Sequence, residues 1–180
     1  MTKTIYISGP FTDLSTDQPR EGWQKDFMDA ETKLRRMGFG VINPVDIVRE
    51  VDEEWQQQWT LAGDMNKWNG PIANAFLKQV PTRGTYIVAC LQRMNDEAMA
   101  GRLHGVYVLG SLSHDLLAKP RIYHSDGVNM ELRMAHILGI PIFAQFYDDC
   151  EIDLHLLPVK DGKRLTDNGD FGKENWSKRL

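Results

Sequence analysis

Four short aliphatic segments alternate with helical patterns along the chain, and this alternation constrains the fold more than any other feature. The segments are 3–9 (KTIYISG), 39–43 (FGVIN), 105–109 (GVYVL) and 140–146 (IPIFAQF). Strands that are apolar on both faces are typical of parallel sheets that helices cover on both sides. The sequence therefore predicts an α/β fold with a central parallel sheet.

The helical patterns lie between these strands. Residues 21–37 carry apolar side chains at three- and four-residue steps and end at Gly38, residues 85–103 form a second pattern, and a third opens near residue 128. Residues 45–84 contain Trp55, Trp59 and Trp68 without a sustained period. We expect one or two short helices there, in an excursion that acts as a lid or an oligomer contact.

Composition narrows the class of protein. The chain has 180 residues, 42% of them hydrophobic, and a formal net charge of −4, which suits one soluble domain. The acidic balance argues against binding of a nucleic acid polymer, and no apolar run is long enough to span a membrane. The start of the chain lacks the apolar region of a secretory signal, and Cys90 and Cys150 lack metal-ligand spacing. A reduced, cytoplasmic protein without a metal is expected.

The carboxyl ends of the strands are where ligands gather in an open parallel α/β sheet. Three loops leave such ends, at 9–20, 44–84 and 110–127. The first begins in YISGPF and the last ends in SDGVNME, so both bring small residues and free backbone N–H groups to the same crevice.

Glu131 stands at the head of an apolar helical stripe formed with Met134, Ala135 and Leu138. We expect Glu131 in the first turn of this helix, where the helix dipole favours its ionised form although it points inward. An ionised, partly desolvated carboxylate is a competent nucleophile. The alternative is an ordinary N-terminal glutamate that satisfies orphan backbone amides.

Two further side chains are candidates for the same crevice. Asp96 also heads an apolar stripe, with Met99, Ala100 and Leu103, and two inward acids on neighbouring helices suggest glycosyl transfer. Asp96 can equally be a solvated turn residue. Tyr6 shares a strand face with Ser8 and can point its hydroxyl at an acid, although a strand tyrosine is more often simply part of the core.

These stretches together resemble the nucleoside 2-deoxyribosyltransferase superfamily, including its 2′-deoxynucleoside 5′-monophosphate N-glycosidase branch. The resemblance rests on IYISGPF (5–11), DEAMAGRLHGVYVL (96–109) and SDGVNMELRMAHILGIPI (125–142). It implies a three-layer, Rossmann-like or flavodoxin-like fold with four to five parallel strands over residues 1–150. The last thirty residues, 151–180, are polar and contain glycine, so we expect a tail or an arm there. One departure is His104, at a position where the family usually has an acid.

The resemblance also implies residue roles. Glu131 would be the nucleophile, Asp96 would handle the base, and Tyr6 would position the nucleophilic carboxylate. Ser125 stands where the monophosphate branch typically has a serine and the nucleoside branch an acid, so it is expected to accept a phosphate; its alternative role is to cap the helix. The substrate-binding residues would be Ser8, Gly9, Pro10, Phe11, Ser125, Gly127 and Asn129.

The expected activity is cleavage of the N-glycosidic bond of a nucleoside 5′-monophosphate, without cofactor or metal, by a homo-oligomer that is most simply a dimer. Three alternatives remain open. They are base exchange by a deoxyribosyltransferase, nucleotide binding or sensing by an inactive module of the same fold, and a structural protein that uses the tryptophan-rich excursion as a contact surface.

Overall fold

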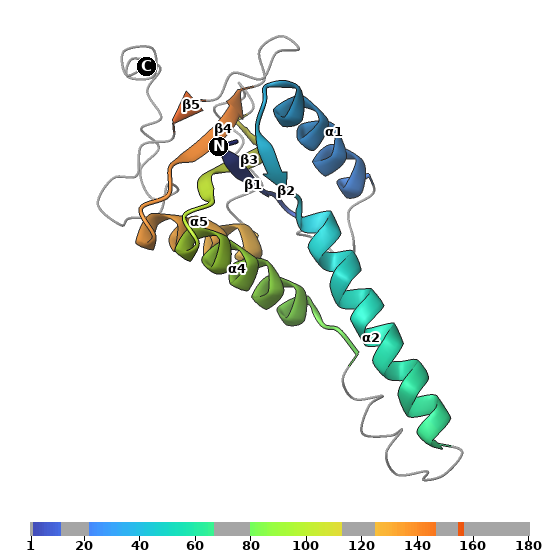
Figure 1. Ribbon diagram of the computed structural model, residues 1–180. Coiled ribbons are helices and arrows are strands. Elements are labelled where there is room, and N and C mark those ends of the chain that lie inside the picture. The colour runs from blue at the N-terminus through green and yellow to red at the C-terminus, as the bar shows by residue number, and fades with distance from the viewer. Residues whose placement is uncertain (1, 12–21, 67–79, 113–124, 147–154, 157–180) are drawn as a thin grey trace.

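The computed structural model of the protein (Figure 1) describes residues 2–11, 22–66, 80–112, 125–146 and 155–156. A five-stranded sheet has the order β2-β1-β3-β4-β5. Its strands are β1 (Thr4–Ser8), β2 (Gly40–Ile42), β3 (Leu103–Leu112), β4 (Ile142–Phe146) and β5 (His155–Leu156). The first four pair in parallel, as the aliphatic segments predict, and β5 adds a two-residue antiparallel edge.

The helices divide between the two faces of the sheet (Figure 1). Helix α1 (Trp23–Arg36) buries Phe27, Ala30 and Leu34 against one face. Helices α4 (Arg83–Met99) and α5 (Asp126–Ile137) cover the other face together with the start of α2 (Pro44–Asn66). The protein is therefore a three-layer α/β fold, as expected.

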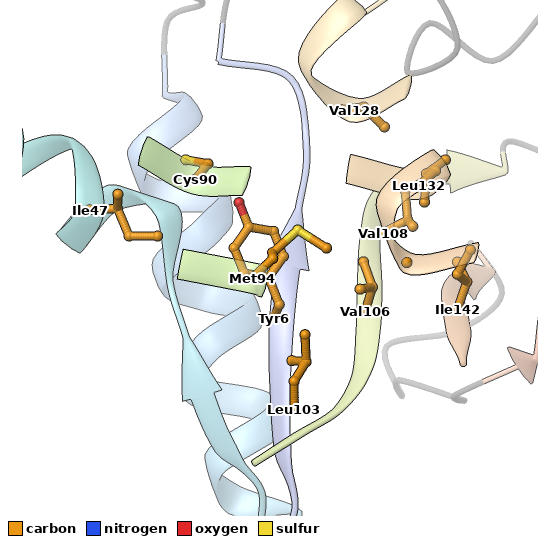
Figure 2. Packing of buried hydrophobic residues seen from close by; sticks show 11 residues of the cluster. Tyr6, Ile47, Cys90, Met94, Leu103, Val106, Val108, Val128, Leu132 and Ile142 are labelled. Carbon is orange, nitrogen blue, oxygen red and sulfur yellow. The ribbon is translucent and has the colours of Figure 1, made fainter. Parts of the chain in front are cut away.

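Strand β1 serves both halves of the core because successive side chains of a strand point to opposite faces. Ile5 and Ile7 pack on the α1 side, whereas Tyr6 lies on the side of α4 and α5. Figure 2 shows Tyr6 in this second cluster, with its hydroxyl directed toward Cys90 of α4. Tyr6 and Ser8 are completely buried, so the face of β1 that carries them is closed to solvent.

The connections create a topological switch point between β1 and β3. The chain leaves β1 through α1 on one face to reach β2, and it leaves β3 through α5 on the other face to reach β4. Crossovers that depart in opposite directions leave a crevice beyond the carboxyl ends of the two strands, where α/β proteins place their ligands.

Helix α2 corrects the expectation of one or two short helices in residues 45–84, because it is continuous over 23 residues. The Asn43 side chain caps its start by accepting a hydrogen bond from the Val45 N–H at 3.0 Å, and Pro44 occupies the first helical position. Val48, Val51 and Trp55 follow at three- and four-residue steps, which is a helical period.

Helix α2 runs past the carboxyl edge of the sheet (Figure 1). It lies antiparallel to α4, because Glu50 pairs with Arg93 at 2.5 Å and Asp52 accepts a hydrogen bond from Tyr86 at 2.7 Å. Trp55 and Trp59 stack on its outer part with ring centroids 5.7 Å apart. Trp68 lies outside the described residues.

Asn43 is a buried junction whose loss should be measurable. Its Nδ2 donates to Glu31 at 2.7 Å while its Oδ1 caps α2. Asn43→Ala removes both bonds, so we expect the free energy of unfolding to fall by about 1–3 kcal/mol. Urea denaturation would measure the change, with Gln92→Ala on the exposed face of α4 as the control. Equal stabilities of the two variants would contradict this role.

Candidate active site

Glu131 is a buried carboxylate at the switch point. It is the sixth residue of α5, whose Ser125 N-cap precedes Asp126, so it lies in the second turn and not in the first as expected. The dipole therefore favours its charge less than the sequence argument assumed. Its residue exposure is only 6%, and the apolar side chains Val128, Leu132 and Ala135 of the same helix are buried around it.

Two hydroxyl groups of β1 hold the two oxygens of this carboxylate. The Tyr6 hydroxyl donates to Oε1 at 2.7 Å, and the Ser8 hydroxyl donates to Oε2 at 2.5 Å. The two donors are two residues apart on one strand and therefore face the same way. The structure thus brings Tyr6 and Glu131 together as the resemblance implied, and it adds Ser8 to the pair.

Burial and hydrogen bonding act on the ionisation of Glu131 in opposite directions. Burial raises the pKa of the carboxyl, the bonds from Ser8 and Tyr6 lower it, and the net result is a rise from 4.5 to about 7. For Tyr6, burial first and the neighbouring Glu131 second raise the pKa well above its ordinary value. The tyrosine therefore stays a neutral donor while Glu131 changes its charge near neutral pH.

Cys90 is a member of this site that sequence reasoning did not single out. It is buried on α4, beside the Tyr6 hydroxyl, and interacts electrostatically with Glu131. Burial, followed by the effect of Glu131, raises the pKa of its thiol to about 12, so it remains protonated. In the sequence, Cys90 lies four residues before Met94 on the apolar stripe of α4. That position does not distinguish it from an ordinary core residue.

The residues after β1 pack on the α1 side of the sheet. A Cβ on Gly9 would lie 3.0 Å from the Phe27 ring and 3.1 Å from Leu109, so a larger residue would push these layers apart. Phe11 packs on Trp23 and Phe27, with ring centroids 4.6 and 5.2 Å away. Pro10, which lies between Gly9 and Phe11 in the chain, is half-buried. Whether these residues also contact a substrate stays a prediction.

The start of α5 lies beside the start of α4. Ser125 is buried and its hydroxyl accepts a bond from the Val128 N–H at 3.5 Å, which is the capping role weighed against phosphate binding. A Cβ on Gly127 would be 3.5 Å from Ile87 of α4, and Arg83 lies 3.4 Å from Asp126. Asn129 is half-buried, and its N–H donates to the Ser125 carbonyl at 3.0 Å.

Asp96 is not brought to Glu131. It is exposed and lies three residues before the end of α4. Cys90, which does reach the Tyr6–Glu131 pair, is six residues earlier, and that separation is roughly 9 Å along a helix. The expected pair of inward acids on neighbouring helices is therefore absent from this arrangement. His104 is also exposed, and its Nδ1 accepts a bond from the Thr4 N–H at 3.2 Å.

Comparisons with known proteins find no match to a family model, to a curated protein or to a solved structure. Within the part of the chain that the structure describes, no cluster of three or more His, Cys, Asp or Glu side chains could hold a metal ion. In the same part, no helix is both long enough and apolar enough to cross a membrane.

The raised pKa of Glu131 predicts a stability difference that depends on pH. The folded protein binds this proton up to about pH 7, whereas the unfolded chain loses it near 4.5. Relative to Glu131→Gln, the wild type should therefore lose stability as the pH rises between these values, on the order of 3 kcal/mol in total. Urea denaturation of both proteins from pH 4.5 to 8 measures this.

Glu53→Gln provides the matched control, because Glu53 is exposed on α2. Its stability should follow the wild type across the same pH range. If the difference between wild type and Glu131→Gln is independent of pH, the carboxyl of Glu131 does not titrate near neutral pH in the folded protein.

Proposed function

We propose that the protein cleaves the N-glycosidic bond of a nucleoside or deoxynucleoside 5′-monophosphate, with Glu131 as the nucleophile. The observation that carries this proposal is the buried carboxylate held by Tyr6 and by Ser8, the last residue of β1, which lies in the middle of the sheet. A structural glutamate gains nothing from this place, since burial disfavours its charge. A carboxylate nucleophile does gain from being fixed and poorly solvated.

The reaction has two steps. In the first, one oxygen of Glu131 forms a bond to C1′ of the sugar as the bond from C1′ to the base nitrogen breaks, and its electron pair leaves with the base. The negative carboxylate stabilises the oxocarbenium character that develops at C1′. In the second step, water attacks C1′, its proton passes to solvent, and Glu131 leaves as a carboxylate. An incoming base in place of water would give transfer.

Tyr6 contributes to both steps through its hydrogen bond to the Glu131 carboxylate. Because its hydroxyl keeps its proton at neutral pH, it donates to Oε1 whenever Glu131 is ionised. This bond fixes the carboxylate before attack and stabilises it again when it leaves C1′. Cys90 lies buried next to the tyrosine hydroxyl.

The preference for a 5′-monophosphate rests on the start of α5. Its first backbone N–H groups and the Ser125 hydroxyl are donors, and the end of a helix that carries such groups favours an anion. Arg83 adds a positive charge from the start of α4, although it already pairs with Asp126. Ser125 can serve the cap and a phosphate together, because a hydroxyl both accepts and donates.

An inactive nucleotide-binding module is the second candidate, and the position of Asp96 favours it. A departing base carries negative charge, and an acid that protonates it is worth about 10²–10⁴-fold in rate. Asp96 is too far along α4 for that role in this arrangement. Release of free base from a nucleotide by the wild type would exclude a module that only binds.

We also propose a homo-oligomer that uses the outer part of α2. Trp59 and Leu61 are exposed there, next to the half-buried Trp55. Aromatic surface of this kind is a common feature of contacts between protein chains.

Glu131→Gln should abolish base release and leave the fold intact. The amide keeps the shape of the side chain and still accepts a bond from one hydroxyl, but it is no longer a nucleophile. We expect activity to fall by at least about 10³-fold. Chromatographic detection of free base would measure it, with circular dichroism to confirm folding. Full activity in the folded variant would exclude Glu131 as the nucleophile.

Asp96→Asn tests whether the exposed acid reaches the base. From its position we expect the activity to change by less than about threefold, as for a surface charge remote from the reaction. The measurement compares kcat/KM for a natural base and for a base that leaves without protonation. A large loss that is confined to the natural base would show that Asp96 donates the proton.

Ser125→Asp tests the phosphate. A carboxylate at the start of α5 keeps the cap but repels a dianion, so kcat/KM for 5′-monophosphates should fall at least tenfold more than that for nucleosides. Assays of matched nucleotide and nucleoside pairs give this ratio. A wild type that cleaves nucleosides and ignores their monophosphates would contradict the proposed preference.

A further inference from the structure

The resemblance gives Ser8 a place among the substrate-binding residues, but its hydroxyl is already engaged within the protein. Its oxygen lies 2.5 Å from Oε2 of Glu131, and its residue exposure is 0%. A buried hydroxyl that donates its one proton to a carboxylate has no proton left for a substrate. The contact joins residues 123 positions apart, so it depends on the complete β1–α5 packing.

We propose that Ser8 is a positioning residue that, together with Tyr6, holds both oxygens of Glu131 and keeps this buried carboxylate ionised for attack. The inference rests on the proposed nucleophilic role of Glu131. Both donors come from the same face of one buried strand, so they form a rigid pair. Each oxygen then has its own donor, and the carboxylate cannot rotate without breaking both bonds.

The other groups near Glu131 do not stabilise its negative charge, so this role falls to the hydroxyls of Tyr6 and Ser8. Among the residues that the structure describes, the titratable neighbours are Tyr6 on β1 and Cys90 on α4, and burial keeps both of them protonated at neutral pH. Arg93 of α4 acts on Cys90, but its guanidinium is 2.5 Å from Glu50 of α2. The charge on Glu131 is thus stabilised by neutral donors, and loss of one donor must favour the protonated form.

The test measures the ionisation of Glu131 directly, in the protein without substrate. Carbon-13 NMR of glutamate labelled at the side-chain carboxyl follows the titration, and Glu131→Gln identifies the resonance by its absence. The wild-type midpoint is expected at about pH 7. Ser8→Ala should move it upward by about one pH unit, a tenfold gain in proton affinity, because a hydrogen bond to the charged form is lost.

Three variants separate positioning from simple loss of structure. Ser8→Thr keeps a hydroxyl and should restore the wild-type midpoint. Ser8→Cys keeps the size but is a weak donor, so its midpoint should rise as in Ser8→Ala; it replaces the alanine variant if that protein does not fold. Ser125→Ala also removes a buried hydroxyl, but one that caps α5, so it should leave the midpoint unchanged.

The activity profile supplies the second readout. If Glu131 must be ionised, kcat/KM rises with pH through the midpoint, and the acid limb of Ser8→Ala should move by the same amount as its NMR midpoint. An unchanged midpoint in Ser8→Ala and Ser8→Cys would overturn the proposal. If the Ser8 variants shift the midpoint but the wild type releases no base, the role of Ser8 toward Glu131 is upheld and the proposed function is rejected.

Discussion

A carboxylate enclosed between a helix and a central strand is the constraint on which the rest of the site depends. Burial alone would leave Glu131 protonated at neutral pH, and the two β1 hydroxyls oppose that tendency. For this to work, β1 must lie in the middle of the sheet, present Tyr6 and Ser8 to α5, and pack Ile5 and Ile7 on α1. The three-layer fold is what makes these requirements compatible.

Burying the charged Glu131 carboxylate therefore lowers the stability of the folded protein. A protonated carboxyl or an amide would fit the same surroundings at lower cost, and well-packed proteins keep such groups mainly where chemistry needs them. Burial also raises the pKa values of Cys90 and Tyr6, and this holds both side chains in their neutral forms. The result is a set of buried neutral groups around one residue whose charge changes near neutral pH.

Periodicity was sufficient to predict the fold but not the details of the site. The four aliphatic strands and α1 follow from local patterns, and the stripe around Ala135 placed Glu131 on the inner face of α5. The expected stripe below Asp96 does not exist, because Met99 and Ala100 are exposed and Leu103 already belongs to β3. Asp96 was therefore expected to face inward near Glu131 and is found exposed near the end of α4.

Other features needed long-range information. The contacts of Glu131 with Tyr6 and Ser8 join residues more than 120 positions apart, and nothing local encodes them. Strand β5 has only two residues, too few to show a period.

The most direct test of the nucleophilic role of Glu131 is intact-mass analysis of the protein incubated with a 2′-fluoro-substituted deoxynucleotide, since an electron-withdrawing fluorine slows release of a glycosyl-enzyme. We expect an added sugar phosphate that peptide mapping places on Glu131. Base release without that adduct, or an adduct on another residue, would contradict the nucleophilic role of Glu131.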